Sequence, residues 1–189
     1  MRAAIRTCQY LHTTRLIGIT YSGGQTHAAE GAADADWAGC PDTRESTTGS
    51  LVISRGAAVM WSSHRQRNLA LPSAESEYVA ANHCARDIIW FRRISAFIGN
   101  TQKDPTRILE DSSSTLRWCE DYPSWAKTRH VDIKYRKVNE YIKRRKVLPV
   151  KVHTNAQPAD CLTKSVPHAV LSNLRPLFLG YDPSSPPPT

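Results

Sequence analysis

The 189-residue sequence lacks a long hydrophobic run, and this shortage excludes a class of protein. No apolar stretch approaches the roughly 20 residues that a bilayer-spanning helix needs. Residues 1–10 also lack the continuous apolar segment of a secretion signal. We therefore expect an intracellular protein without a membrane partner.

Cysteine is scarce and scattered, and no Cys-x-x-Cys pair occurs. An odd number of widely spaced cysteines argues against a disulfide framework and against a structural zinc site. We interpret them as small core or surface residues. The five are Cys8, Cys40, Cys84, Cys119 and Cys161.

Acidic residues are outnumbered, with 17 Asp and Glu against 25 Lys and Arg, so the formal net charge is +8. A balance this basic favours an anionic partner such as nucleic acid. The length suffices for one well-buried core and not for two.

Hydrophobic periodicity and turn residues predict an α/β fold, in which a mixed sheet carries helices on its surface. After a short amphipathic helix and a connector, the pattern of apolar and polar residues changes near Asp34. A tight hairpin is expected around Gly56, from strands 50–55 and 57–61. The further expected elements are helix 73–98, strand 106–110, helix 127–146, strand 147–152, and a helical region 158–179 interrupted at Pro167 and Pro176.

Four acidic residues stand where strands and helices begin or end. Hydrolysis of a phosphodiester can use two divalent ions about 4 Å apart, and hard ions such as Mg²⁺ and Mn²⁺ prefer carboxylate ligands. Each acid alone has an ordinary explanation, as a loop residue, a helix-start acid or an N-cap. The four candidates are Asp34, Glu77, Asp111 and Asp160.

Glu75 competes with Glu77 for the place on helix 73–98, because the helix dipole favours both. Glu77 shares a stripe with Ala81 and Ile88 and so is expected to face the core, whereas Glu75 shares one with Arg86. A carboxylate aimed at an apolar interior needs a cation to compensate it. We therefore favour Glu77.

Segment 127–146 holds nine Lys or Arg residues against two acids. Its apolar stripe should face the sheet, which leaves a one-sided basic face suited to phosphate contacts. A solvated surface helix is the alternative. The basic residues expected to bind nucleic acid are Lys134, Lys137, Arg144 and Arg145.

Two histidines could move protons near such a centre. His153 follows the last strand and stands shortly before Asp160, so it is the better candidate for a catalytic role. His130 is the other candidate, and a plain exposed histidine is an equal alternative for each.

At these residues the sequence resembles the ribonuclease H domain of copia-type retrotransposon Pol polyproteins. The similar pieces keep the family's order over roughly residues 34–180. They are Asp34-Ala-Asp-Trp-Ala-Gly39, Ser46-Thr-Thr-Gly49, Trp61-Ser-Ser63, Ala74-Glu-Ser-Glu-Tyr78, Ile89-Trp-Phe-Arg-Arg93, Lys127-Thr-Arg-His-Val-Asp-Ile133 and Ala159-Asp-Cys-Leu-Thr-Lys164. The opening, residues 6–21, is similar to the end of the reverse transcriptase that precedes this domain.

The resemblance implies a ribonuclease H-like fold with a five-stranded mixed sheet and flanking helices. It also implies two Mg²⁺ ions, with Mn²⁺ as a substitute, held by the four carboxylates named above. The implied substrate is the RNA of an RNA–DNA hybrid made in reverse transcription, in a cytoplasmic virus-like particle or the nucleus, with reverse transcriptase and integrase as adjoining portions. The expected division is a connector over 1–27, the domain over 28–180 and a disordered tail over 181–189.

Some positions depart from the family. Residues 110–112 read Glu-Asp-Ser where Cys-Asp-Asn is usual, and Pro72 replaces a usual Ser. The first strand, over Ala- and Gly-rich residues 28–33, is expected to be poorly formed. A decayed copy that binds nucleic acid without cutting is thus an alternative. An integrase or transposase core is disfavoured, because those carry their Glu on a late helix.

Overall fold

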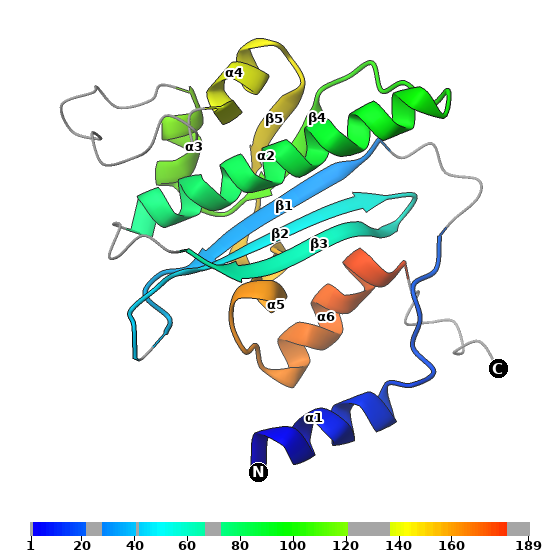
Figure 1. The fold of residues 1–189 in the computed structure, drawn as a ribbon, viewed down its shortest axis with the longest axis vertical. Helices are drawn as coiled ribbons and strands as arrows, with labels where there is room; N and C mark the ends of the chain where they lie inside the picture. Colours follow the sequence, from blue (N-terminus) through cyan, green and yellow to red (C-terminus); the bar gives the residue numbers. More distant parts are fainter. Residues whose placement is uncertain (1, 22–27, 41, 67–72, 121–136, 181–189) are drawn as a thin grey trace.

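A five-stranded sheet lies at the centre of the computed structural model, which describes residues 2–21, 28–40, 42–66, 73–120 and 137–180 (Figure 1). Its strands are β1 (Glu30–Asp36), β2 (Thr47–Ser54), β3 (Ala57–Arg65), β4 (Thr106–Glu110) and β5 (Val147–Lys151). The order across the sheet is β3-β2-β1-β4-β5. β1, β4 and β5 run parallel, whereas β2 and β3 form an antiparallel hairpin beside β1. The expected mixed sheet is confirmed.

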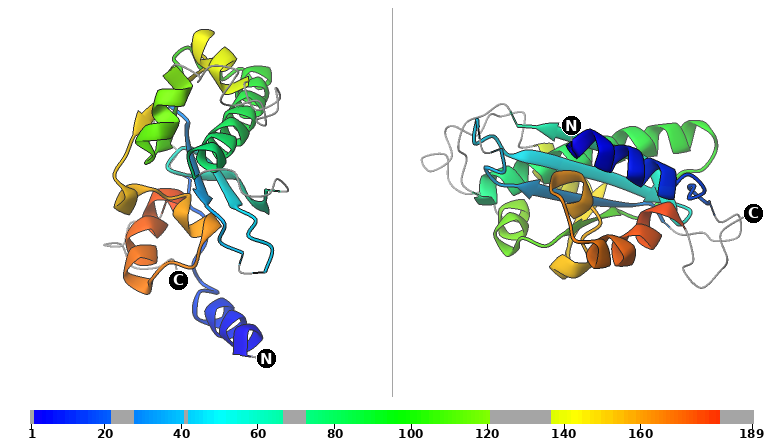
Figure 2. Two further views of the ribbon diagram at one scale, coloured as in Figure 1. Left: turned by 90° about the vertical axis from the view of Figure 1, so that its left-hand side faces the viewer. Right: turned by 90° about the horizontal axis from the view of Figure 1, so that it is seen from below.

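Helices cover both faces of this sheet (Figures 1 and 2). On one face α2 (Ser73–Phe97) packs on β1 and β2, with α3 (Ser113–Glu120) and α4 (Lys137–Lys143) beside it. On the other, α5 (Asp160–Thr163) packs on β1 and β2, and α6 (His168–Leu179) on β3. A short 3₁₀ turn, η2 (Thr154–Ala156), precedes α5.

The opening helix α1 (Arg2–Thr13) projects away from the sheet (Figure 2). The segment that follows it returns to the domain, where Thr20 N donates to Leu179 O at 2.8 Å and the Tyr21 hydroxyl donates to Ala58 O at 2.7 Å. Among the described helices, none combines the length and apolarity that crossing a bilayer would demand.

Strand β1 is well formed, so the expectation of a weak first strand was wrong. It pairs with β2 along its whole length and with β4 over its first three residues. Its small residues are the reason it suits this place, because they let α2 come close. A Cβ on Gly31 would lie 2.6 Å from Ile88 Cδ1 and 2.7 Å from Cys84 Sγ. The low strand propensity of the Ala and Gly residues is thus outweighed by close helix–sheet packing.

The hairpin and α2 agree with the sequence prediction. Arg55 and Gly56 connect β2 to β3 with positive φ values of 54° and 81°, which is the geometry of a tight two-residue turn. α2 ends one residue before the expected end, and Gly99 follows it with φ 83°.

Two helix predictions need correction. The described part of segment 127–146 is helical only over Lys137–Lys143, and the chain then turns through Arg145, which has φ 54°. Residues 121–136 lie outside the described part. Pro167 does separate α5 from α6, but Pro176 lies within α6 and does not break it. A mid-helix proline removes one backbone hydrogen bond, and packing of α6 on β3 compensates for that loss.

Candidate metal centre

The site begins where two neighbouring parallel strands separate. β1 and β4 pair only as far as Ala32 and Leu109, after which β1 continues with β2 alone. Gln157 fills the opening: its fully buried side chain donates from Nε2 to Ala33 O at 2.9 Å and to Leu109 O at 3.2 Å. The carboxyl ends of separating parallel strands are a common place for ligand sites. Side chains that follow either strand can therefore meet here.

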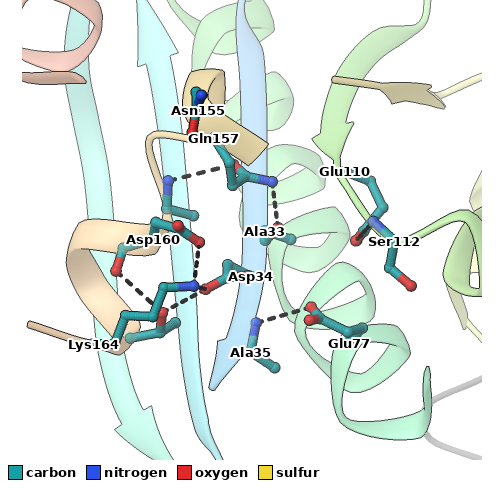
Figure 3. A network of polar contacts seen from close by, with 12 residues as sticks. Ala33, Asp34, Ala35, Glu77, Glu110, Ser112, Asn155, Gln157, Asp160 and Lys164 are labelled. Carbon is teal, nitrogen blue, oxygen red and sulfur yellow. Dashed lines mark hydrogen bonds and ion pairs between the residues drawn. The ribbon is translucent and has the colours of Figure 1, made fainter. Parts of the chain in front are cut away.

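Three of the four predicted carboxylates do meet at this point, and Figure 3 shows two of them, Asp34 and Glu77. Asp34 comes from β1, Glu77 from the second turn of α2, and Asp111 directly follows β4. One oxygen of each lies within 4.8 Å of the others. Glu77 is fixed by Ala35, whose backbone N–H donates to Oε2 at 2.9 Å.

Burial and mutual repulsion perturb this cluster. Burial raises the pKa of Asp34 to about 7, and the nearby Asp160 adds to the rise although a hydrogen bond from Thr163 opposes it. Burial likewise raises the pKa of Glu77 to about 9, with Asp34 and Asp111 contributing. Acids crowded together out of water resist ionisation unless a cation compensates them. The cluster therefore favours either protons or a bound cation.

A buried carboxylate that the sequence analysis missed lies directly behind the cluster. Glu110 ends β4 with no exposed surface. Its Oε1 accepts a hydrogen bond from Ser112 N at 3.0 Å, while Oε2 has no partner within the described residues. Burial, followed by the charge of Glu77, holds the pKa of Glu110 well above its usual range. An orphaned buried oxygen beside three acids increases the local demand for a cation.

Asp111 is available as a ligand, because the capping role belongs to its neighbour. Ser112 Oγ accepts from Thr115 N at 3.2 Å and so caps α3. The ordinary explanation for Asp111, that it is a helix cap, is therefore not supported. Lys151 donates to the backbone carbonyl of Asp111, which fastens the end of β4 to that of β5.

The residues present fit a hard divalent cation. All donors are carboxylate oxygens, the ligand type that Mg²⁺ and Mn²⁺ prefer. Oxygens at about 2.1 Å from one Mg²⁺ can lie at most about 4.2 Å apart. The 4.8 Å limit on the three oxygens is close to this, so small side-chain movements suffice.

Asp160, the fourth predicted carboxylate, approaches from the opposite face of the sheet. It begins α5, is 5% exposed, and lies beside Asp34 rather than within the group of three. Lys164 stands between these two acids, with Nζ at 2.9 Å from Asp160 Oδ1 and 3.9 Å from Asp34 Oδ2. The Thr163 hydroxyl also donates to Asp34 Oδ2. Although partial burial works against it, the bond to Asp160 and the charge of Asp34 raise the pKa of Lys164.

The structure places Glu77 in the cluster, and its stripe partners Ala81 and Ile88 are buried as expected, but burial does not distinguish it from Glu75. Glu75 is the more buried of the two, at 4% exposed, whereas Glu77 is only partly buried. Glu77 is not turned into an apolar core. It lies at the rim of the sheet, where the backbone of β1 and the other acids surround it.

His153 is exposed and lies just after β5. Its Nδ1 accepts a hydrogen bond from Asn155 N at 3.2 Å, which makes it the N-cap of η2. It is not part of the carboxylate group. A catalytic role for His153 stays a prediction, and His130 lies outside the described residues.

The basic residues spread along α4 and do not gather at the carboxylates. Lys137 begins α4 at the end tied to α2, since Asn139 accepts a hydrogen bond from the Tyr78 hydroxyl. Arg144 and Arg145 lie past its other end, and Arg144 pairs with Glu140 at 2.7 Å. Lys134 lies outside the described residues.

The missed residues differ in how far sequence could have revealed them. Lys164 follows Asp160 by four residues, a spacing that predicts an ion pair on one helix face. The sequence marked Glu110 only as a departure from the Cys that is usual at this position in the family. Gln157 gave no periodic signal, because its role depends on two strands that are distant in sequence.

Comparison with known proteins places this geometry in context. No protein-family model matches the chain. A retrovirus-related Pol polyprotein from transposon TNT 1-94 of Nicotiana tabacum is 36% identical over 145 residues, covering 77% of this chain and 11% of the relative. The retrovirus-related Pol polyprotein from transposon RE1 of Arabidopsis thaliana is 27% identical over 173 residues, covering 92% and 12%. The chain thus spans about a tenth of the length of these relatives.

Among solved structures, the ribonuclease H1 named LC11, crystallised in complex with an RNA/DNA hybrid, superposes with a TM-score of 0.51. The identity is 14%, and the alignment covers 72% of this chain and 94% of that one. At this identity the likeness concerns the fold. The chain is therefore a ribonuclease H-like domain, homologous to a segment of the copia-type retrotransposon Pol polyproteins.

Proposed function

We propose that the chain is a ribonuclease H that cuts the RNA strand of an RNA–DNA hybrid with the help of divalent metal. The single observation that carries this proposal is the meeting of Asp34, Glu77 and Asp111 within 4.8 Å, at the separated ends of β1 and β4. Its support in the comparisons is the fold shared with a ribonuclease H1 whose crystal contains the hybrid.

Each residue has a proposed part. Asp34, Glu77 and Asp111 hold a first Mg²⁺ or Mn²⁺, and Asp34 and Asp160 hold a second. When bound, such ions supply an activated water and stabilise charge on the phosphate. Ala35 N–H keeps Glu77 oriented, and Gln157 keeps the gap between β1 and β4 at a fixed width. His153 is proposed to move a proton at the leaving oxygen.

The test is cleavage of a labelled hybrid by the purified chain, with Mg²⁺ and with a chelator. We expect cleavage of the RNA strand only with metal, and its loss in Asp34→Asn with a cooperative unfolding transition, and hence the fold, retained. Asp104→Asn is the matched control, because Asp104 is an exposed loop residue before β4 and does not belong to the carboxylate group. Full activity in Asp34→Asn would remove Asp34 from its proposed role.

The basic residues are proposed to hold the nucleic-acid backbone. Lys137 has the best position, because its end of α4 is tied to Tyr78, the residue after Glu77. Arg144 and Arg145 follow the other end of α4 and belong to the proposed set, as Lys134 does by sequence. Lys137→Gln should weaken hybrid binding and reduce the slope of log affinity against log salt by about one. An unchanged slope would exclude a phosphate contact by Lys137.

The alternative is a decayed domain that binds hybrid without cutting it. The same assay separates the two functions, since a decayed copy would retain hybrid binding and show no metal-dependent cleavage. As a ribonuclease H the chain would act inside the cell during reverse transcription, beside reverse transcriptase and integrase portions of a polyprotein. Residues 1–27 would then be a connector and 28–180 the domain.

A further inference from the structure

Lys164 lies between two buried acids, which an ordinary surface lysine does not. Its ammonium group stands between Asp160 and Asp34, at 2.9 Å and 3.9 Å from the nearer oxygens (Figure 3). Asp160 is 5% exposed and Asp34 is 3% exposed, so little water is left to solvate their charges. Close by, Thr163 donates its hydroxyl to Asp34 Oδ2.

Backbone packing brings these groups together. Gly49 lies opposite Asp34 in the β1–β2 ladder, and a Cβ there would be 2.8 Å from Ala159 O and from Thr163 Cγ2. The absence of a side chain at Gly49 thus lets α5 settle onto the sheet. Asp160 at the start of α5 and Lys164, the C-cap residue that follows it, then both lie beside Asp34.

Two nearby buried acids need a positive charge between them, and here a side chain supplies it. A divalent ion shared by Asp34 and Asp160 would have to be close to the same oxygens. Lys164 is able to leave, because its side chain is 41% exposed and lysine has a flexible stem. A tethered cation and a free cation therefore compete for one pair of carboxylates.

We propose that Lys164 is an internal counter-ion that holds the Asp34–Asp160 pair in the metal-free chain and is displaced when a second divalent ion binds. This rests on the proposed function, which supplies the ions. The first ion, at Asp34, Glu77 and Asp111, binds while Lys164 remains in place. The second binds more weakly, because it has to expel the ammonium group.

Titration of the full chain with Mn²⁺, with free ion measured by electron paramagnetic resonance, tests this competition. The wild-type chain should bind a first ion more tightly than a second. Lys164→Met should tighten the second site by at least about tenfold and the first site by less. Lys143→Met, which removes an exposed positive charge from α4, is the matched control and should behave as wild type. A second site that is unchanged or weaker in Lys164→Met would overturn the proposal.

A structural role alone for Lys164 predicts a different result. If the lysine only fastened α5, Lys164→Met would lower the unfolding temperature and leave Mn²⁺ affinity unchanged, and this outcome also overturns the proposal. Displacement can be observed directly from the rate of acetylation of each lysine, measured by mass spectrometry. Saturating Mg²⁺ should accelerate modification of Lys164 and leave that of Lys143 unchanged. A slower or unchanged rate at Lys164 contradicts displacement.

Hybrid cleavage in the same preparations separates this inference from the proposed function. If the chain cuts the hybrid while Lys164→Met binds Mn²⁺ as wild type does, the counter-ion proposal fails and the ribonuclease proposal stands. If Lys164→Met tightens the second site but no preparation cuts, the ribonuclease proposal fails and the counter-ion proposal stands.

Discussion

At the scale of single residues, the choice between Glu75 and Glu77 has a direct test. Glu77 lies in the carboxylate group, while Glu75 is buried two residues earlier in α2. Glu77→Gln should reduce hybrid cleavage by about a hundredfold or more, because a ligand to the metal is lost. Glu75→Gln should retain cleavage once its folding is verified by circular dichroism. The reverse pattern would transfer the role to Glu75.

The raised pKa values of Asp34 and Glu77 predict how stability depends on pH. Both are about 4 in an unfolded chain, whereas burial raises that of Asp34 to about 7 and that of Glu77 to about 9. The folded state thus binds these protons more tightly than the unfolded state. Stability is then full below pH 4 as far as these groups are concerned, and it falls as the pH rises towards 7 and 9.

Thermal unfolding in chelator should show this fall as a lower melting temperature at pH 8 than at pH 5.5. The loss should be on the order of a few kcal/mol. Mg²⁺ should restore stability at pH 8, since a cation compensates the ionised acids. Asp34→Asn should make the melting temperature in chelator depend less on pH. A chain that is more stable in chelator at pH 8 than at pH 5.5 would contradict the perturbed pKa values.

At the scale of elements, close contact between β1 and α2 determines where Asp34 and Glu77 stand. A side chain at Gly31 would collide with Cys84 and Ile88. Gly31→Ala should therefore cost about 1–3 kcal/mol of unfolding free energy, measured by urea denaturation. Gly18→Ala is the control, because nothing lies within 4 Å of a Cβ at that position. Equal stability of the two variants would refute the close packing.

The predictability of these elements followed the strength of their local signals. α2 could be placed to within one residue, because its periodicity and the following Gly99 agree. β1 was misjudged, since the benefit of its small residues comes from Cys84 and Ile88, about fifty residues away. The end of the basic helix was misplaced because β5 begins at Val147 and requires a turn through Arg145 just before it.

The candidate site was predictable in its chemistry and not in its surroundings. Carboxylates at strand and helix ends indicated Asp34, Glu77 and Asp111 as partners, and the fold brings them together. Sequence spacing could not show that Glu110 is buried behind them. Nor could it show that Gln157 bridges the separated strands, because both features depend on the register between β1 and β4.

At the scale of the whole molecule, the fold brings acidic side chains from four separate parts of the chain to one site that favours a cation. β1 and β4 separate, α2 approaches from one face, and α5 approaches from the other. Within the part of the chain that the structure describes, the only ion pair to these acids is the one that Lys164 makes with Asp34 and Asp160. Metal binding is thus the property on which the proposed activity depends.

The most direct test is anomalous diffraction from crystals of the chain soaked in Mn²⁺. The account predicts a strong peak about 2.2 Å from oxygens of Asp34, Glu77 and Asp111, and its absence in crystals of Asp34→Asn. Soaked wild-type crystals without manganese at these three carboxylates would contradict the account.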